Sequence, residues 1–435
     1  MSEKNIEVVV RGGLCTGCGT CAASCSREAV TLVRRNDIYQ PVIDERLCNN
    51  CGLCVNVCPG HEVDFGRLNE SVSKYQPTNL YLGNFIGCYH GYVSDETLRY
   101  DSASGGLITG LLLYSLEKGF IDGAIVTKIN YENLEPVPFL ARTKEEIIES
   151  VGSKYCPVPL NISLRNILDK EGRYAVVGLP CHIHGLRKFE LYSKKLRERI
   201  VMRLGIMCSH NLSFKATEYI ISSLGMKKEE ISRLSYRGKG WPGYLTFEDR
   251  HGRKVEIPYS KFGHMHFLHF FVQERCLLCC DQSCELADIS FGDAWLKEFR
   301  EKDNVGHSLI VVRTKEGEYI LKKAKAENRV LVEMIDPSKV IQSQKDVLRF
   351  KKKTLNVYME IRKLKRMPVP KYNTQLASPG IFDYVLAFLF AFNRIISKYR
   401  KLWFAINLLV KIELSIARFF NMIMQGVMRS VNRRS

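Results

Sequence analysis

The sequence lacks the features that most quickly assign a chain to a membrane or nucleotide-binding class. Its first 13 residues contain no apolar stretch of the kind that forms a signal peptide. No uninterrupted apolar run reaches the roughly 18 to 20 residues that a membrane-spanning helix requires. There is also no P-loop, and the glycine pair at 105–106 does not form a G-x-G-x-x-G motif. We therefore expect a cytoplasmic protein that does not cross a membrane.

Positive charge is abundant, but it is unevenly distributed. The formal net charge is +18, from 64 Lys and Arg against 46 Asp and Glu. Residues 351–435 hold 17 basic and 3 acidic side chains, a net of +14, so the other 350 residues carry only +4. Because the charge belongs to a tail that also contains many apolar residues, the sequence argues against a nucleic-acid partner.

Eight of the 16 cysteines form two closely similar runs, Cys15-x2-Cys18-x2-Cys21-x3-Cys25 and Cys48-x2-Cys51-x2-Cys54-x3-Cys58-Pro59. This spacing is typical of two [4Fe–4S] clusters, with the fourth cysteine of each run ligating the other cluster. It assigns Cys15, Cys18, Cys21 and Cys58 to one cluster, and Cys48, Cys51, Cys54 and Cys25 to the second. Zinc knuckles or disulfides are the alternative, which the doubled spacing and a reducing cytoplasm disfavour.

These runs define the first part of the predicted architecture. Residues 1–70 form an α+β ferredoxin-like domain, and Gly17, Gly19 and Gly52 stand where its tight turns need permissive backbone. Residues 71–90 are predicted to be a linker. The expected order is thus a small two-cluster module followed by a larger domain.

Strand-like and helix-like segments alternate between residues 91 and 345, which predicts an α/β domain with a mostly parallel sheet. The strand-like segments are 123–128, 174–177, 200–206, 289–291 and 308–313, and helical patterns cover 107–118, 163–170, 184–196 and 214–224. The glycine-rich region 236–259 is better explained as an antiparallel insertion.

A second group of cysteines is more loosely spaced. Cys181 and Cys208 follow two of the predicted parallel strands, at the sheet edge where α/β domains bind their ligands. A helix that begins near Cys181 should lower the pKa of this thiol. We predict a third [4Fe–4S] cluster on Cys181, Cys208, Cys276 and Cys279, with Cys280 and Cys284 as spare or substitute ligands. The alternative is that some of these, like Cys88 and Cys156, are structural cysteines.

The segment Ser104-Gly105-Gly106 precedes the predicted helix 107–118 and is a candidate phosphate site. Ser104 could cap the helix, and the glycines would let backbone amides approach a pyrophosphate. A capped, buried helix explains the pattern equally well.

Two groups of histidines stand near the predicted sites. The run from His264 to His269 is interpreted as a packed or partner-facing surface rather than a metal site. His182, His184 and His210 adjoin the predicted cluster cysteines, where any of them could tune a cluster or move a proton.

The C-terminal segment, 346–435, is predicted to be a basic amphipathic helical tail. Residues 351–366 are strongly basic and helical in pattern. Polar residues recur in steps of three and four over 407–429, opposite a wide apolar face that includes Phe404 and Leu408. Such a helix fits the surface of a membrane, but packing on a partner subunit or on the chain's own body explains it as well.

The ordered motifs of residues 85–300 resemble the coenzyme F420 hydrogenase/dehydrogenase beta-subunit family. They are Ser104-Gly105-Gly106, the segment 119–126, Gly152-Ser153-Lys154-Tyr155, Gly178-Leu-Pro-Cys181, Gly205-Ile-Met-Cys208 and Cys276-x2-Cys279-x8-Asp288-Ile-Ser-Phe-Gly-Asp293. The resemblance implies FAD bound near Ser104, Gly105, Gly106, Ser153, Lys154 and Tyr155, and hydride exchange with F420. His182 departs from the family, in which Gln is common, and Ser26 stands in place of the usual proline after Cys25.

Together these features predict an iron–sulfur flavoprotein oxidoreductase. It would exchange a hydride with F420 through FAD, and single electrons with a ferredoxin or a membrane carrier through its clusters. The tail predicts electron delivery at the inner face of the membrane. One alternative is a related flavin and cluster reductase with another substrate, as in surface-polysaccharide biosynthesis. The other is a non-catalytic electron-transfer or assembly subunit that binds no flavin.

Overall fold

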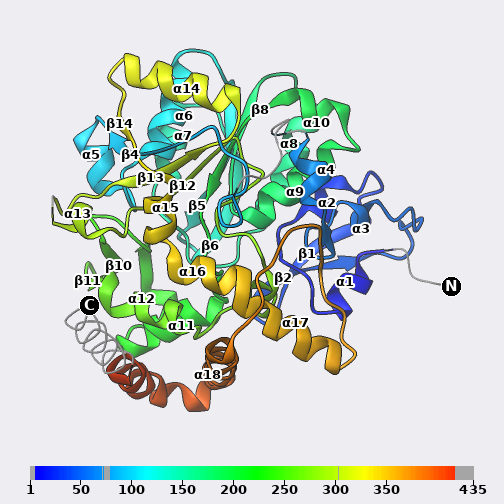
Figure 1. Ribbon diagram of the computed structural model, residues 1–435, viewed down its shortest axis with the longest axis vertical. Helices are drawn as coiled ribbons and strands as arrows, with labels where there is room; N and C mark the ends of the chain where they lie inside the picture. The colour runs from blue at the N-terminus through cyan, green and yellow to red at the C-terminus, as the bar shows by residue number, and fades with distance from the viewer. Residues whose placement is uncertain (1–4, 71, 73–78, 302, 417–435) are drawn as a thin grey trace, which may run out of the picture.

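The computed structural model describes residues 5–70, 72, 79–301 and 303–416 of the chain. A small cysteine-rich module packs against a large α/β body, and the C-terminal helices run along one edge of the molecule (Figure 1). The 71–90 segment, expected to be a linker, is partly structured, because strand β4 of the body begins within it at Gly87.

The N-terminal module consists of short helices around a hairpin. The hairpin strands β1 (Val30–Arg35) and β2 (Ile38–Ile43) pair antiparallel. The other elements are α1 (Glu7–Arg11), α2 (Thr20–Ser24), α3 (Leu53–Asn56), β3 (Glu62–Val63) and α4 (Phe65–Asn69). Helices α2 and α3 start directly after Gly19 and Gly52, which have left-handed φ values of 89° and 79°. A residue with a Cβ would be strained there, which confirms the predicted need for glycine.

The body is built on an eight-stranded sheet of order β14-β4-β13-β12-β8-β7-β5-β6. The central strands β5 (Gly123–Asn130), β7 (Tyr174–Gly178), β8 (Ile200–Ile206) and β12 (Ile289–Asp293) are parallel. The flanking strands β4 (Gly87–Val93), β6 (Glu135–Ala141), β13 (Ser308–Val312) and β14 (Val330–Met334) pair antiparallel. The predicted parallel arrangement therefore holds in the centre of the sheet, and the antiparallel flanks extend it.

Helices cover both faces of the sheet. On one face lie α6 (Leu107–Glu117), α7 (Lys144–Glu149) and α14 (Lys315–Ala326), and on the other α8 (Arg165–Leu168), α9 (Pro180–Glu190) and α10 (Lys194–Arg199). Successive side chains of β5 point to opposite faces of the sheet. Val126 packs in the hydrophobic core under α6, α7 and α14, and Ile125 packs in the core under α8, α9 and α10. Smaller helices are α5 (Glu96–Asp101), α13 (Lys297–Arg300), α15 (Pro337–Ser343) and α16 (Lys345–Arg349).

The predicted antiparallel insertion is confirmed as a three-stranded sheet. Its strands are β9 (Ile231–Ser235), β10 (Tyr244–Asp249) and β11 (Lys254–Pro258), flanked by α11 (Phe214–Ser223) and α12 (Tyr259–Phe267). The insertion lies beside the carboxyl ends of the central strands, where it can cover a ligand site (Figure 1).

The C-terminal segment contacts both other parts. A π-helical turn (Phe350–Thr354) leads into α17 (Leu355–Leu364), and the short strand β15 (Lys371–Tyr372) then pairs parallel with β3 of the module. Helix α18 (Ile381–Lys398) follows, and a further helix begins at Ile406 and reaches the last described residue, Ile416. The rest of the predicted 407–429 helix lies outside the described residues. Within the described ranges, no helix is both long and apolar enough to cross a bilayer.

Candidate iron–sulfur and flavin site

The four cysteines assigned to the first cluster lie close enough for their charges to influence one another. Burial, together with the thiolate charges of Cys58 and Cys18, raises the pKa of Cys15 to about 12. After burial, the charges of Cys18, Cys58 and Cys15 also raise the pKa of Cys21. The amide of Gly17 donates to the Cys15 sulfur at 3.4 Å. Buried thiols with amide donors are suited to binding iron as thiolates.

The second set lies nearer the surface. Burial raises the pKa of Cys54, and the charges of Cys51 and Cys48 contribute to the rise. A hydrogen bond from the Ile6 backbone amide opposes it. Cys51 is exposed. In the described part of the chain, no three His, Cys, Asp or Glu side chains converge on a single metal ion. A [4Fe–4S] cluster instead takes four cysteines distributed over four iron atoms.

The structure also brings together the four cysteines predicted to form the third set. Burial raises the pKa of Cys181 well above its usual value, and the charges of Cys18, Cys208, Cys276 and Cys279 act in the same direction. The expectation that the helix N-terminus would lower this pKa is therefore wrong, because burial and neighbouring thiolates outweigh the helix dipole. The amide of Asn211 donates to the Cys276 sulfur at 3.3 Å.

Lys351 is a buried cation of this site, although by its sequence position it belongs to the predicted basic tail. It is 1% exposed, and its Nζ donates to the Cys276 carbonyl at 3.3 Å. Although burial lowers the pKa of Lys351, the thiolates of Cys279, Cys208 and Cys276 raise it above its usual value overall. A lysine held charged beside these thiolates would offset their negative charge. Because it stands in a run of basic residues, no sequence signal distinguishes it.

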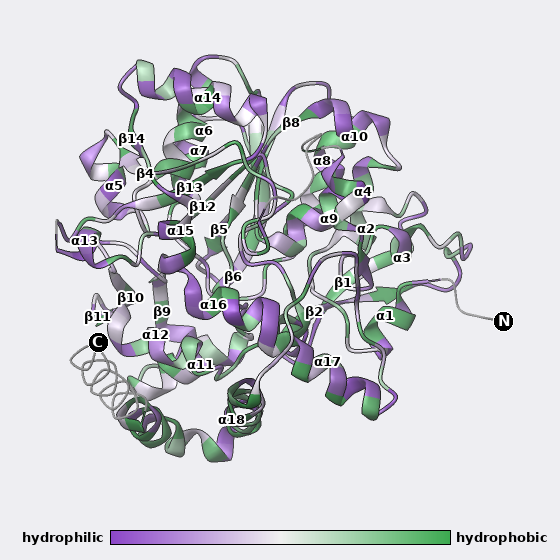
Figure 2. Ribbon diagram, in the orientation of Figure 1, coloured by the Kyte–Doolittle hydropathy of each residue, from purple (hydrophilic) through white to green (hydrophobic). Residues whose placement is uncertain are grey.

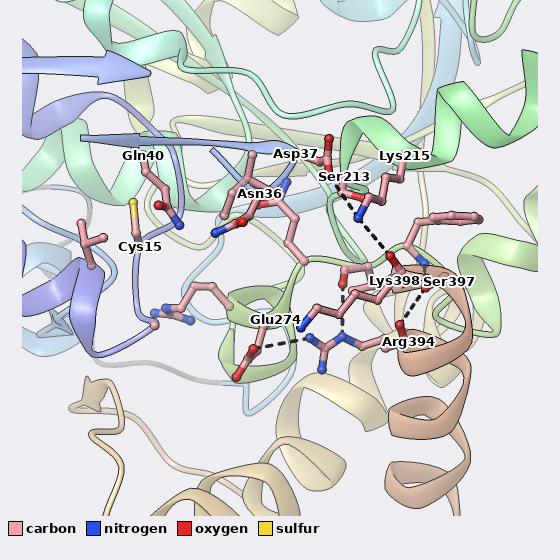
Figure 3. A pocket seen from close by; sticks show the side chains of 17 residues that line it. Cys15, Asn36, Asp37, Gln40, Ser213, Lys215, Glu274, Arg394, Ser397 and Lys398 are labelled. Carbon is pink, nitrogen blue, oxygen red and sulfur yellow. Dashed lines mark hydrogen bonds and ion pairs between the residues drawn. The ribbon is translucent and has the colours of Figure 1, made fainter. Parts of the chain in front are cut away.

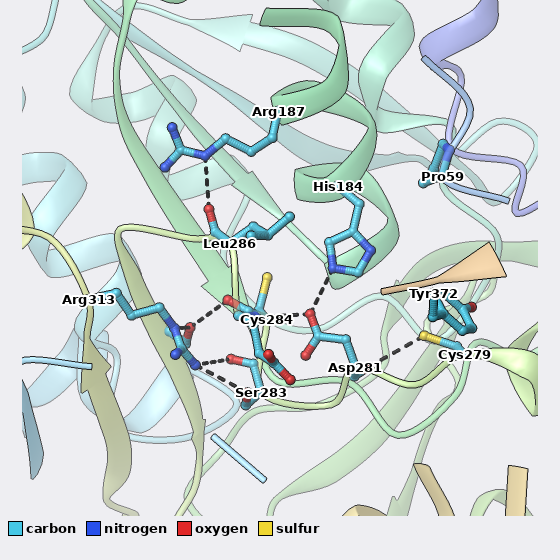
Figure 4. A network of polar contacts seen from close by, with 12 residues as sticks. Pro59, His184, Arg187, Cys279, Asp281, Ser283, Cys284, Leu286, Arg313 and Tyr372 are labelled. Carbon is cyan, nitrogen blue, oxygen red and sulfur yellow. Dashed lines mark hydrogen bonds and ion pairs between the residues drawn. The ribbon is translucent and has the colours of Figure 1, made fainter. Parts of the chain in front are cut away.

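Cys280 and Cys284 lie beside the third set and are completely buried. A lattice of hydrogen bonds fixes their loop (Figure 4). Arg313 donates to the Ser283 carbonyl at 3.0 Å, and His184 bonds Asp281 at 2.8 Å. These contacts hold the loop in place around the cysteines, which is a structural role for His184.

His182, His266 and His269, which were also singled out in the sequence, are packed in the interior. The ring of His182 bonds the Leu179 amide at 3.1 Å and the Val158 carbonyl at 2.9 Å, and burial lowers its pKa to about 4. His266 and His269 are 9% and 3% exposed, which agrees with the predicted packed surface. Their neighbours are His210 and nearby aromatic rings.

The module and the body meet where the first and third sets approach each other. The charge of Cys18 is the largest thiolate influence on Cys181. Asn161 bridges the two loops, because its Nδ2 donates to Thr20 Oγ1 and to the His182 carbonyl, both at 2.8 Å. The Cys18 sulfur lies 3.2 Å from the same Thr20 oxygen.

Three cations of the body bind backbone carbonyls of the module. Arg275 donates to Leu14, Pro59 and Gly60 at 3.1–3.3 Å, Lys188 to Cys58 and Glu62 at 2.8 and 2.6 Å, and Arg165 to Ala22 and Cys25 at 2.5 and 3.0 Å. Most of these carbonyls belong to, or lie next to, a cysteine loop. These bonds fix the orientation of the module on the body.

A cavity of about 410 Å³ opens beside Cys15 (Figure 3). Its walls come from the β1–β2 hairpin, the body and α18. Ion pairs join these walls, Lys215 to Asp37 at 3.2 Å and Arg394 to Glu274 at 3.6 Å. The cavity therefore gives a path from outside to a predicted ligand of the first cluster.

The candidate phosphate site lies at the same sheet edge as Cys181 and Cys208. Gly106, in a left-handed conformation, precedes α6, which has no side-chain cap. The prediction that Ser104 caps the helix is wrong, since its hydroxyl donates to the His307 carbonyl at 2.8 Å instead. A Cβ on Gly105 would lie 2.5 Å from the Gly91 carbonyl oxygen. The first backbone amides of α6 have no capping side chain, and the two preceding residues are glycines. This arrangement fits the phosphates of FAD.

Tyr155 lies at the same edge, beside Arg237, which no sequence pattern indicated. The buried Arg237 donates to Asp293 at 2.6 Å and to the Tyr155 hydroxyl at 3.3 Å, while its Nη2 has no partner among the described residues. An unsatisfied buried donor marks a place for an acceptor group. Lys154 points elsewhere, because its Nζ donates to the carbonyls of Ser150, Val151 and Gly152.

Three family models match the chain. The models of the coenzyme F420 hydrogenase/dehydrogenase beta subunit match residues 88–165 with the N-terminal part and 171–338 with the C-terminal part. The 4Fe-4S dicluster domain matches residues 14–61.

Several curated relatives cover much of the chain. Coenzyme F420 hydrogenase subunit beta of Methanosarcina barkeri is 31% identical, over 57% of this chain and 81% of its own length. An F(420)H(2) dehydrogenase subunit of Methanosarcina mazei is 26% identical, over 80% of this chain and 92% of its own. Coenzyme F420-dependent sulfite reductase of Methanocaldococcus jannaschii is 27% identical, over 81% of this chain but only 52% of its own length.

A chain of the F420-reducing [NiFe] hydrogenase complex from Methanosarcina barkeri has a similar fold. The TM-score is 0.53 at 24% identity, and the match covers 69% of this chain and 98% of that one.

These findings define an iron–sulfur protein of the electron-transfer class, with a dicluster domain on an α/β body. The chain belongs to the coenzyme F420 hydrogenase/dehydrogenase beta-subunit family, as its motifs predicted. Its named relatives are subunits of hydrogenases and dehydrogenases or a reductase, so its enzyme class is oxidoreductase.

Proposed function

We propose that the protein transfers electrons between coenzyme F420 and a one-electron carrier, by way of FAD and three [4Fe–4S] clusters. The observation that carries this proposal is the contact between the loops of the first and third cysteine sets, where Asn161 donates to Thr20 Oγ1 and to the His182 carbonyl, both at 2.8 Å. That contact supports a continuous path from the sheet edge of the body to the surface of the module. The names of the relatives support F420 as the substrate.

Bound FAD would supply both hydride exchange and single-electron transfer, and the clusters would each carry one electron. The residues of the chain provide the setting. Backbone amides at the start of α6 would bind the FAD phosphates, and Arg237 would donate to an acceptor on the flavin side. Lys351 would balance the thiolate charge of Cys208, Cys276 and Cys279.

The outer end of the path has two accessible points. Cys51 is exposed, and the cavity beside Cys15 reaches the first set. We propose that a redox partner protein approaches the module here, either a soluble ferredoxin or a carrier complex at the inner face of the cell membrane. The relatives' membership in multi-subunit hydrogenase complexes supports a partner of this kind.

The test is an anaerobic absorbance spectrum of the protein reconstituted with iron, sulfide and FAD, before and after addition of reduced F420. We expect the F420 to be oxidised while the flavin and cluster bands bleach together. If FAD binds but F420 is inert, the substrate is wrong and the flavin assignment stands. If no FAD is retained, the protein is a flavin-free subunit and the proposal is wrong.

A further inference from the structure

The C-terminal helices present two different sides. The inner side of α18 packs on the body through buried residues spaced three and four apart, Asp383, Ala387, Phe390, Asn393 and Ser397. Asn393 donates to the Leu268 carbonyl at 2.9 Å, and the Ser397 hydroxyl accepts from the Phe271 amide at 2.9 Å. Of the three contacts that the sequence left open for this tail, the inner side of α18 makes the one with the chain's own body.

The outer side is apolar and exposed. On α18, Ile381, Val385 and Phe388 are 88%, 59% and 79% exposed, and beyond it Phe404 and Leu408 are 84% and 61% exposed. Figure 2 shows apolar colour along α18 and the segment after it, at one edge of the molecule. Scattered exposed apolar residues are ordinary, but a continuous row on neighbouring helices marks an interaction surface.

The charges of this segment are sorted by side. Between Ile381 and Ile416 there are two acidic residues, and both are buried. Asp383 accepts from the Thr354 hydroxyl at 2.8 Å, and Glu413 accepts from Asn393 at 3.0 Å. The cations Lys401 and Lys411 are exposed, whereas Lys398 is exposed on the side of α18 that walls the cavity beside Cys15. Lys411 stands three residues from Leu408 and therefore on the same side of its helix. The expectation that the polar residues of 407–429 lie opposite Leu408 is wrong for Lys411. Within Ile381–Ile416 the outer side thus combines apolar and cationic groups, and one exposed carboxylate from α17, Glu360, accepts from the Tyr384 hydroxyl at 2.7 Å.

We propose that this outer side, the exposed residues of Ile381–Ile416, binds the surface of an anionic lipid bilayer. An amphipathic helix lying in the interface buries its apolar residues among acyl chains and places its lysines at anionic headgroups. A second copy of the chain would bring lysines against lysines, which is unfavourable. This inference rests on the proposed function. If the protein exchanges electrons with a carrier complex at the membrane, the outer side is the surface that would bring it there.

The position of α18 gives this contact a consequence for electron transfer. Arg394, Ser397 and Lys398 of the same helix wall the cavity beside Cys15. A bilayer bound to the outer side would therefore lie one helix away from that cavity. Membrane binding would hold the predicted first cluster close to carriers at the membrane surface.

The experiment is co-flotation of the full chain with vesicles, one set of phosphatidylcholine alone and one set of equal phosphatidylcholine and phosphatidylglycerol. We expect at least about tenfold tighter binding to the anionic vesicles, since each lysine at an anionic surface contributes severalfold. The Lys401→Glu, Lys411→Glu double variant should lose this preference. Phe388→Ser should weaken binding at least about fivefold, because it removes an apolar side chain that the bound protein would bury among the acyl chains.

Met334→Ser is the matched control, since Met334 on β14 is 77% exposed, like Phe388, but belongs to the body sheet. Unchanged flotation of Phe388→Ser would overturn the proposal, as would equal affinity for both vesicle types. A dimer in light scattering that Phe388→Ser makes monomeric would instead identify the face as a contact between copies, and would also overturn it. F420 oxidation in solution should be the same in every variant, so failure of the lipid inference and failure of the proposed function are separate results.

Discussion

Gly185 of α9 packs directly on Thr20 of α2, and a Cβ atom at position 185 would lie 2.2 Å from the Thr20 hydroxyl oxygen. Helix α9 begins beside Cys181, and α2 contains Cys21. The close approach of these two helices is what places the first and third cysteine sets next to each other. The absence of a side chain at Gly185 is therefore a condition for the proposed electron path.

Gly185→Ala should separate the two helices and destabilise the protein by about 1–3 kcal/mol, because the Thr20 hydroxyl belongs to a hydrogen-bonded contact that cannot easily retreat. Thermal unfolding of the cluster-loaded protein would measure the loss. Thr20→Ala in the same chain should restore part of it, since this change removes the clashing oxygen. Additive effects of the two substitutions would contradict the contact. Gly380→Ala, where the nearest atom to an added Cβ would lie 3.8 Å away, is the control.

Removal of the buried cation should change the reduction potential of the proposed third cluster. Lys351→Met deletes a positive charge beside Cys276 and Cys279 while keeping an apolar stem of similar length. The reduced, more negative state loses stabilisation, so the potential should fall by about 60 mV for every 1.4 kcal/mol of lost interaction. A redox titration followed by electron paramagnetic resonance would show it. Lys363→Met on the exposed part of α17 should leave the potential where it was, and equal shifts in both variants would rule out the local effect.

The cysteine assignment can be tested by iron content. Cys279→Ser or Cys276→Ser should reduce the iron bound by the reconstituted protein from about three clusters to about two per chain. Cys280→Ser is the matched control, because Cys280 is adjacent and fully buried but outside the predicted set. A loss of iron in Cys280→Ser, with none in Cys279→Ser, would transfer the ligand role to Cys280.

We expect His182 to make a pH-dependent contribution to the free energy of unfolding. Burial lowers its folded pKa to about 4, while the unfolded value is about 6.5. Between these values the unfolded chain binds the extra proton, so stability should fall as the pH falls from about 6.5 to 4. At pH 5.5 this amounts to about 1 kcal/mol.

Gln at position 182 can accept from the Leu179 amide and donate to the Val158 carbonyl, as the imidazole does. His182→Gln should therefore unfold at the same temperature as the unchanged protein near pH 8 and resist acid better at pH 5.5. A variant that loses stability equally at both pH values would show that the ring packs rather than titrates.

Local sequence patterns predicted the elements that depend on local chemistry. The doubled cysteine spacing, together with the glycines at 19 and 52, predicted the tight turns of the module. Continuous apolar runs predicted the central parallel strands. The flanking strands β4, β6 and β14 were not predicted, because their pattern is mixed and their pairing depends on residues far away in the chain.

The missed site residues share one property, which is that tertiary contacts define them. Lys351 belongs to a basic run in the sequence, and only its burial against Cys276 gives it a role at the site. Arg237 and Asn161 have no distinctive sequence context, and each depends on a partner more than 50 residues away, Asp293 for Arg237 and Thr20 for Asn161. Ser104 failed as a cap because the His307 carbonyl, brought close by the sheet, competes for its hydroxyl.

The central claim is that electrons cross from the body to the module between Cys181 and Cys18. The most direct test is rapid anaerobic mixing of FAD-loaded protein with reduced F420, while the flavin and cluster absorbance are recorded separately, in the unchanged chain and in Cys181→Ser. The account predicts that the flavin is reduced in both proteins, and that the module's clusters are reduced quickly only in the unchanged chain. Equally fast reduction of the module's clusters in Cys181→Ser would contradict the path.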